Sequence, residues 1–200
     1  MRFLALGDSY TIGESVAAWE RWPVQLAGLL RAEGFPVEDP AIIATTGWTT
    51  DELWAGIDRA NPSGVYDLVS LLIGVNNQYR GRGRDEYRRQ FAALLERAVG
   101  FTGEKRSGVL VLSIPDWGVT PFAQGRDRAA IAAEIDAFNA INREAAGRLG
   151  VHYIDVTPLS REAADDLSLL ASDGLHPSGK MYAAWARLAL PSARQALTDL

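Results

Sequence analysis

Residues 67–74 read DLVSLLIG, an apolar run interrupted by a single serine. The run is continuous rather than alternating, which is typical of a central strand in a parallel sheet whose two faces are both covered by helices. Four other short apolar runs are candidate strands: RFLAL at 2–6, AIIAT at 41–45, GVLVLSIP at 108–115 and VHYIDV at 151–156. The sequence therefore predicts a sheet of five short strands.

Stretches with helical periodicity lie between these runs and after the last one. We expect helices at 22–33, 49–60, 85–99, 127–148 and 177–197. Pro191 should bend or interrupt the last helix, because proline cannot donate a backbone hydrogen bond. Strand and helix alternate without a long linker, repeat or change of composition, so we predict one three-layer α/β/α domain over residues 1–200 with a parallel sheet.

The composition is that of an ordinary globular protein, with 48% hydrophobic and 22% charged residues among 200. A net charge of −5 gives no reason to expect nucleic-acid binding. There is no cysteine, which excludes disulfides and thiolate metal sites. No apolar stretch approaches the roughly 18 residues of a membrane span, and the first apolar run is too short for a secretory signal. We therefore expect a cytoplasmic protein with no integral membrane segment.

Parallel sheets of this type bind ligands beyond the carboxyl ends of their strands. Residues with useful chemistry follow the strand candidates: Gly7-Asp8-Ser9, Thr46-Gly47-Trp48, Gly74-Val75-Asn76-Asn77, Pro115-Asp116-Trp117 and the segment 172–177. They include a serine, small residues, side-chain amides and an acid–histidine pair. The topology alone predicts that these groups meet at one edge.

Ser9 is the candidate nucleophile at this edge. A serine hydroxyl needs a nearby base that takes its proton during attack. His152 lies within a strand candidate, so we interpret it as a structural histidine. His176 lies in a polar turn at the functional edge, where it is either a solvated residue at a helix start or the general base.

Asp173 is the favoured acid for this histidine. It precedes His176 by three residues, so the same loop can bring the carboxylate against the ring, orient it and stabilise its protonated form. Asp8 adjoins the serine and is badly placed to reach the far side of the ring. Asp116 and Asp155 remain alternatives that require long-range contacts.

Attack on an ester carbonyl also requires donors for the developing oxyanion. The backbone N–H groups of Ser9 and Gly47 and the side-chain amide of Asn76 are the candidates. Gly47 has a second interpretation as a turn residue with positive φ, and Asn76 as a cap at the end of a strand.

Four blocks carry a resemblance to a known family: GDSYTIG at 7–13, Gly47, GVN at 74–76 and DGLHP at 173–177. In this order they resemble the four blocks of the SGNH hydrolase superfamily, also called the GDSL esterase/lipase family. The resemblance extends over the whole chain. It implies a flavodoxin-like fold with strand order 2-1-3-4-5 and a serine hydrolase that cleaves carboxylic esters through an acyl-enzyme, without metal or cofactor.

The resemblance also implies a role for each matching residue. Ser9 would be the nucleophile, His176 the base and Asp173 the acid that orients it. Ser9 N–H, Gly47 N–H and the Asn76 amide would form the oxyanion hole.

Two positions depart from the family pattern. Tyr10 replaces the leucine of GDSL, at a position that varies. Asn77 replaces an aspartate that commonly supports the loop rather than reacting, so activity remains the expectation.

The substrate is less well defined by the sequence. Trp48, Tyr79, Trp117 and Phe122 either line an acyl or aromatic pocket or pack as core residues beneath the loops. The run YRGRGR at 79–84 suggests a solvated basic rim, with an anionic head group as a second possibility. We favour a small-molecule ester with a short acyl group, such as an acetyl on a carbohydrate, because no large apolar insertion suggests a tunnel for a long chain.

Other function classes stay open on the residues alone. The segment 9–11 could cradle the phosphate of FMN in a flavodoxin-like binding protein, whose absorption spectrum would reveal the flavin. The domain could also be a catalytically inactive interaction module. A metal-dependent phosphoesterase is less favoured, because one accessible histidine and scattered acids offer no compact ligand set.

Overall fold

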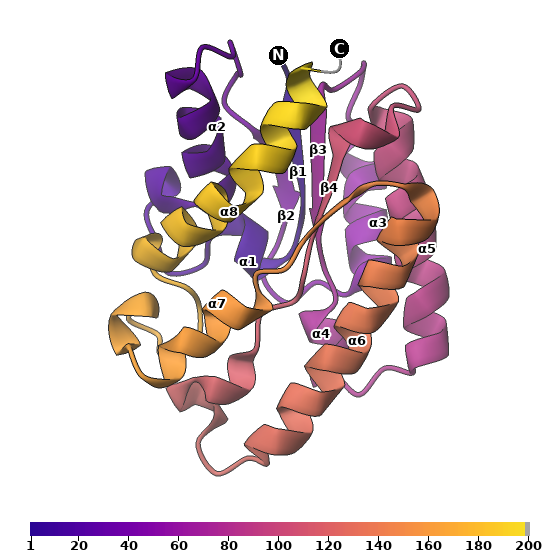
Figure 1. Ribbon diagram of the computed structural model, residues 1–200. Helices are drawn as coiled ribbons and strands as arrows, with labels where there is room; N and C mark the ends of the chain where they lie inside the picture. The colour runs from indigo at the N-terminus through magenta and orange to yellow at the C-terminus, as the bar shows by residue number, and fades with distance from the viewer. Residues whose placement is uncertain (199–200) are drawn as a thin grey trace.

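The computed structural model describes residues 1–198 and contains one five-stranded parallel sheet (Figure 1). Its strands are β1 (Phe3–Gly7), β2 (Ala41–Ala44), β3 (Leu68–Leu72), β4 (Val109–Leu112) and β5 (His152–Ile154). The order β2-β1-β3-β4-β5 confirms the predicted flavodoxin-like topology. Because the strand order reverses between β1 and β3, the loops after these two strands diverge and leave room for a ligand.

Five long helices cover the two faces of the sheet: α2 (Trp22–Ala32), α3 (Thr50–Ala60), α5 (Arg84–Phe101), α6 (Arg128–Leu149) and α8 (Gly179–Thr198). α2 and α8 pack against each other on one face, and α3, α5 and α6 lie on the other. β1, β3 and β4 are buried along their whole lengths, as the continuous apolar run at 67–74 predicts for β3. The three layers are therefore confirmed.

Pro191 does not interrupt the last helix, contrary to one of the two expectations. α8 continues across it to Thr198. Proline removes a single backbone hydrogen bond, whereas Trp185 and Ala189 before it and Ala193 and Leu197 after it are all buried. The packing of this face on the sheet and α2 outweighs the missing bond.

Three short helices were absent from the sequence prediction: α1 (Ser9–Ile12), α4 (Val75–Tyr79) and α7 (Thr157–Arg161). Each lies just beyond the carboxyl end of a strand: α1 follows β1, α4 follows β3 and α7 follows β5. Four or five residues are too few to show helical periodicity. α1 and α4 carry two of the predicted site residues, Ser9 and Asn76.

Gly7 allows α1 to fold back on the end of β1. A Cβ at this position would lie 2.2 Å from Thr11 Oγ1 and 2.5 Å from the carbonyl oxygen of Leu72. No side chain fits in that space. Ser9 consequently begins its helix directly at the edge of the sheet.

Asp8 caps α1 from a fully buried position. One carboxyl oxygen accepts a hydrogen bond of 3.0 Å from Tyr10 N–H, while Oδ2 has no hydrogen-bond partner among residues 1–198. Burial raises the pKa of the Asp8 carboxyl to about 7, and the bond from Tyr10 offsets this only in part.

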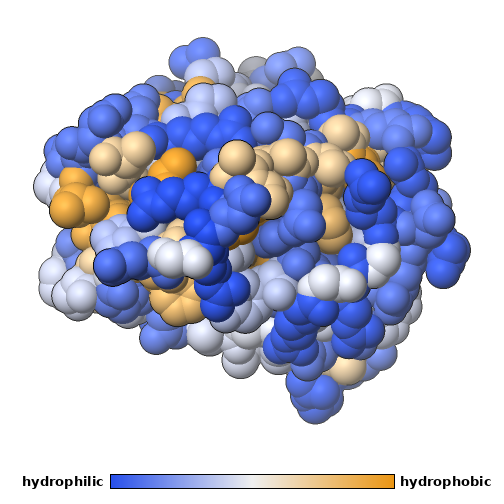
Figure 2. Space-filling model, turned by 90° about the horizontal axis from the view of Figure 1, so that it is seen from below, coloured by the Kyte–Doolittle hydropathy of each residue, from blue (hydrophilic) through white to orange (hydrophobic). Residues whose placement is uncertain are grey.

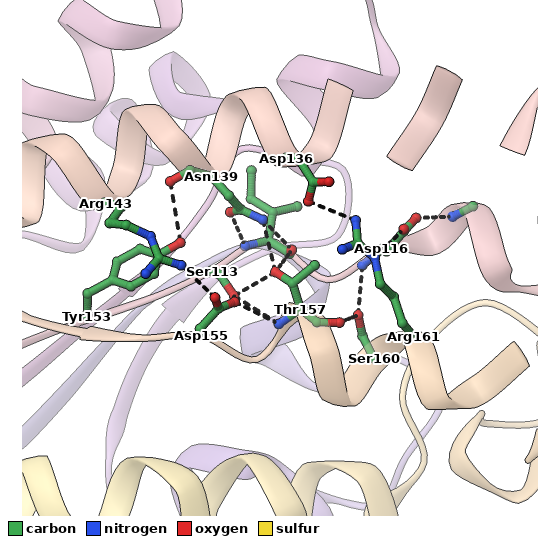
Figure 3. A network of polar contacts seen from close by, with 12 residues as sticks. Ser113, Asp116, Asp136, Asn139, Arg143, Tyr153, Asp155, Thr157, Ser160 and Arg161 are labelled. Carbon is green, nitrogen blue, oxygen red and sulfur yellow. Dashed lines mark hydrogen bonds and ion pairs between the residues drawn. The ribbon is translucent and has the colours of Figure 1, made fainter. Parts of the chain in front are cut away.

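A polar network joins α6 to the ends of β4 and β5 (Figure 3). Asn139 of α6 accepts a hydrogen bond from Ile114 N–H at 2.7 Å and donates to Ile114 O at 2.9 Å and Thr157 Oγ1 at 3.0 Å. Its amide thus pairs both backbone groups of a residue just past β4. At the solvent side of the same network, Arg143 donates to Asp155 at 2.6 Å.

We expect Asn139→Ala to lower the free energy of unfolding by about 2 kcal/mol, because it leaves the buried N–H of Ile114 unpaired, whereas Ile114 O keeps its hydrogen bond from Thr157 Oγ1. Arg143→Ala, which breaks an exposed ion pair, should cost less than about 1 kcal/mol. Urea denaturation of both variants measures the difference. Equal costs would show that the amide does not hold β4 to α6.

Asp8→Asn tests the buried carboxyl. Folding raises the pKa of Asp8, so the folded protein holds this proton more tightly than the unfolded chain does. Below about pH 4 the carboxyl is protonated in both the folded and the unfolded state, and the protein has its full stability. This stability is lost as pH rises through about 7, where the folded state also loses the proton. Relative to wild type, Asp8→Asn should therefore gain stability between pH 4 and 8, by up to about 4 kcal/mol.

Asp166→Asn is the control for this experiment. A hydrogen bond from Lys180 lowers the pKa of Asp166 to about 2, which has the opposite sign. Its stability difference from wild type should change only below about pH 4. A flat difference for Asp8→Asn between pH 4 and 8 would contradict a raised pKa.

Candidate active site

A pocket with a volume of about 160 Å³ opens at the carboxyl edge of the sheet. Its lining residues come from the loops after β1, β2, β3 and β4 and from the loop before α8: Ser9, Tyr10, Thr46, Gly47, Val75, Asn76, Tyr79, Trp117, Phe122, Leu175 and His176. The structure thus gathers Ser9, Gly47, Asn76 and His176 around one space. Figure 2, which views the molecule from below, shows a largely hydrophilic face with separate hydrophobic patches.

Ser9 is the first residue of α1 and is 4% exposed. It lines the pocket together with His176. No hydrogen bond joins its Oγ to the His176 ring within residues 1–198. Catalytic hydrogen bonds often form only when substrate is bound, so this geometry is compatible with a nucleophile and its base.

His176 is paired with Asp173. The ring Nδ1 lies 2.7 Å from Asp173 Oδ2. The other carboxyl oxygen, Oδ1, accepts from the backbone N–H groups of Leu175 and His176, each at 2.9 Å. Asp116 and Asp155, the alternative acids, instead pair with Arg161 and Arg143.

Ser15 adds a donor to this carboxylate that the sequence analysis missed. Its Oγ donates to Asp173 Oδ2 at 2.7 Å from a left-handed backbone with φ +64°. Partial burial works to raise the pKa of Asp173, but the hydrogen bonds from Ser15, His176 and two backbone N–H groups outweigh it and hold the pKa at about 2. The carboxylate therefore stays ionised at neutral pH.

Tyr10 lies beneath the histidine. Its ring centroid is 5.4 Å from that of His176 and 6.3 Å from that of Trp185, and its side chain is buried. The residue that replaces the family leucine thus supports the imidazole. Its place beside the serine was the only sequence signal for this contact.

Gly47 and Asn76 lie opposite these groups. Gly47 has φ +87°, so its interpretation as a turn residue with positive φ is confirmed, and it lines the pocket as well. Asn76 Nδ2 donates to Trp48 O at 2.9 Å, which uses one of its two amide hydrogens. The second is available for a ligand.

Asn77, the other departure from the family pattern, supports the neighbouring helix. Its Oδ1 accepts from Thr50 N–H at 3.1 Å, and its Nδ2 donates to Thr50 Oγ1 at 2.8 Å, in a buried position. An amide can donate and accept here, whereas a carboxylate only accepts. Asn77 thereby fixes the start of α3.

Three of the four predicted aromatic residues form one wall of the pocket. Tyr79, Trp117 and Phe122 pack together with ring centroids 5.4 to 6.2 Å apart. Trp48 does not line the pocket, because its ring lies against Gly56 of α3. Trp48 is partly buried against the core, whereas the other three border the pocket, and a role for them in binding the substrate remains a prediction.

Trp117 is fixed from two sides. Its Nε1 donates to Gln78 Oε1 at 2.8 Å. The preceding residue, Asp116, accepts from Gly118 N–H and from Arg161 Nε, each at 2.9 Å, and this carboxylate belongs to the network in Figure 3. The wall is thus preorganised.

The basic run at 79–84 is largely neutralised. Arg80 pairs with Glu52 at 3.2 Å. Arg82 pairs with Asp51 at 3.8 Å and with Glu86 at 3.3 Å. The second possibility, an anionic head group bound by free arginines, therefore loses its main support.

The second histidine lies away from the pocket, and the described residues form neither a metal site nor a membrane-spanning helix. His152 lies in β5, in register with Leu110, and does not line the pocket. In the described part of the chain, no three His, Cys, Asp or Glu side chains are grouped to hold a metal ion. No helix within residues 1–198 is long and apolar enough to cross a membrane.

Comparison with solved structures shows the same fold in several proteins, two of which are described as esterases. TesA superposes with a TM-score of 0.76 at 18% identity, covering 98% of this chain and 100% of that one. The psychrotrophic esterase EstA from Pseudoalteromonas sp. gives 0.71 at 16%, covering 98% of each chain. Axe2, an acetylxylan esterase from Geobacillus stearothermophilus, gives 0.69 at 19%, covering 98% and 93%.

Sequence comparison identifies the family. No curated protein sequence matches significantly. The family model for GDSL-like Lipase/Acylhydrolase proteins, however, matches residues 5–184, which span all four sequence blocks and every pocket residue named above. The chain therefore belongs to the GDSL-like lipase/acylhydrolase family and is a carboxylic ester hydrolase.

Proposed function

We propose that this protein hydrolyses short-chain carboxylic esters through a Ser9–His176–Asp173 triad and an acyl-enzyme, without metal or cofactor. One observation carries the proposal. His176, whose Nδ1 lies 2.7 Å from Asp173 Oδ2, borders the same 160 Å³ pocket as Ser9, Gly47 and Asn76. That pocket therefore combines a nucleophile, a base and candidate oxyanion donors.

The chemistry proceeds in two halves. His176 takes the Ser9 proton as Oγ attacks the ester carbonyl, and Asp173 stabilises the imidazolium that forms. Ser9 N–H, Gly47 N–H and the free amide hydrogen of Asn76 stabilise the oxyanion. The imidazolium then protonates the leaving alcohol, and a water activated by His176 hydrolyses the acyl-enzyme.

The size of the pocket supports a short acyl group. Its volume of about 160 Å³ is close to that of a cavity that holds a benzene molecule, so roughly six non-hydrogen atoms fit. An acetyl group on a carbohydrate is the favoured substrate, in keeping with the acetylxylan esterase among the structural neighbours.

Ser9→Ala and His176→Ala should each abolish nearly all hydrolysis of p-nitrophenyl acetate measured with EDTA present, because triad members act as one unit. Asn76→Ala should lower kcat roughly 100- to 1,000-fold if the amide binds the oxyanion. Equal rates for wild type and Ser9→Ala would remove Ser9 from the mechanism, and a wild type without hydrolytic activity would favour the inactive interaction module. A near-silent Asn76→Ala would leave Asn76 as a structural cap.

Acyl-chain length tests the pocket. We expect kcat/KM to fall from p-nitrophenyl butyrate to the decanoate in the wild type. Phe122→Ala should raise the decanoate rate relative to butyrate, because it removes one ring of the wall. Trp54→Ala, an exposed aromatic residue outside the pocket, is the control. A decanoate preference in the wild type would contradict a short-chain esterase.

A further inference from the structure

Asn76 in the first turn of α4 and Arg80, which directly follows this helix, hold the loop that contains Gly47. Asn76 Nδ2 donates to Trp48 O at 2.9 Å, and Arg80 Nη2 donates to Gly47 O at 2.6 Å. Asn76 and Arg80 are four residues apart, so they lie on the same side of this helical turn. Two consecutive carbonyls of the β2–α3 loop are thereby fixed to α4.

Arg80 also reaches the far end of this loop through Glu52. Its Nη1 donates to Glu52 Oε1 at 3.2 Å, and Glu52 Oε2 accepts from Thr49 N–H at 2.9 Å. One guanidinium therefore links Gly47 to the cap at the start of α3. Arginine can form such a link because its planar group carries several donors in a fixed geometry.

Gly47 is the residue that most needs this support. Glycine has more backbone freedom than any other residue, and Gly47 sits at φ +87° between β2 and α3. Oxyanion stabilisation depends on donors that are already oriented before the charge develops. A short hydrogen bond from a charged donor to the Gly47 carbonyl fixes the Gly47–Trp48 peptide and so restricts rotation about the Cα–C bond of Gly47, which limits how the loop can reorient at this residue.

We propose that Arg80 is a positioning residue for ester hydrolysis, which holds Gly47 so that its N–H remains directed at the oxyanion. The inference rests on the proposed role of Gly47 in the oxyanion hole. Arg80 is engaged by Gly47 O and Glu52, so it acts through the loop rather than on the substrate.

Arg82 provides a matched control. It lies two residues further along, its side chain is 37% exposed against 42% for Arg80, and it also pairs with an acid of α3, Asp51. Its contacts are with the carboxylates of Asp51 and Glu86, and it donates to no carbonyl of the β2–α3 loop within residues 1–198. The two arginines thus differ in the contact with Gly47.

The experiment compares Arg80→Met, Arg80→Lys and Arg82→Met with p-nitrophenyl butyrate. Arg80→Met should lower kcat about 10-fold, a part of the loss expected for removing an oxyanion donor, and leave KM within about twofold. Arg80→Lys, which has a single ammonium in place of the fork, should give an intermediate kcat. Arg82→Met should match the wild type.

Inhibition by butylboronic acid gives a second readout, because its tetrahedral adduct on Ser9 places an oxygen at the oxyanion position. Its inhibition constant should rise for Arg80→Met by the same factor as kcat falls, and stay unchanged for Arg82→Met. Wild-type kcat in Arg80→Met, a raised KM with unchanged kcat, or an equal loss in Arg82→Met would each overturn the inference. If Arg80→Met does not fold, Arg80→Lys decides by the same criteria.

Ser9→Ala separates this inference from the proposed function. If Ser9→Ala retains wild-type activity, the proposed function fails and the inference falls with it. If Ser9→Ala is inactive and Arg80→Met keeps the wild-type kcat and inhibition constant, the triad stands and only the role of Arg80 is rejected.

Discussion

The close approach between Gly7 and its neighbours is the constraint on which the site depends. With Thr11 Oγ1 and Leu72 O each within 2.5 Å of where a Cβ would be, only glycine lets α1 pack on the end of β1. That turn fixes Ser9 at the edge, and the other groups are arranged around it. His176 and Asp173 approach from the loop before α8, and Gly47 and Asn76 from the loops after β2 and β3.

The side chains of the proposed triad and the loops around the pocket have further contacts that hold them in place. Tyr10 packs under His176, Ser15 and two backbone N–H groups surround Asp173, and Asn77 fixes the start of α3. The network of Asp116, Arg161 and Asn139 steadies the aromatic wall from the other side (Figure 3). Preorganisation of this kind is what allows polar groups to stabilise a transition state without rearranging.

The sequence predicted the five strands, the long helices with a clear helical periodicity, and the residues that follow the carboxyl ends of the strands. Continuous apolar runs marked the strands, and the order of blocks marked Ser9, Gly47, Asn76, Asp173 and His176. Helices α1, α4 and α7 were missed because four or five residues show no periodicity. The effect of Pro191 on the last helix was overestimated, because the packing of a buried helix face outweighs the low helix propensity of one residue.

Contacts between distant residues were beyond what the sequence could predict. Ser15 reaches Asp173 across 158 positions, and Arg80 reaches Gly47 across 33. Trp48 follows the same rule: its position after β2 suggested the pocket, but its partly buried ring packs against the neighbouring glycine of α3. The direction of a side chain in a loop depends on the space that neighbouring elements leave for it, and this space cannot be predicted from the periodicity of the sequence.

The distribution of the site along the chain has a consequence for folding. Ser9 follows the first strand, whereas Asp173 and His176 immediately precede the last helix, so a chain that ends before residue 173 lacks two members of the proposed triad. Domains emerge from the ribosome beginning at the amino end, and the proposed nucleophile is therefore made long before its proposed base. On the proposed mechanism, hydrolysis begins only when the carboxyl-terminal segment that carries His176 has folded against the edge of the sheet that carries Ser9.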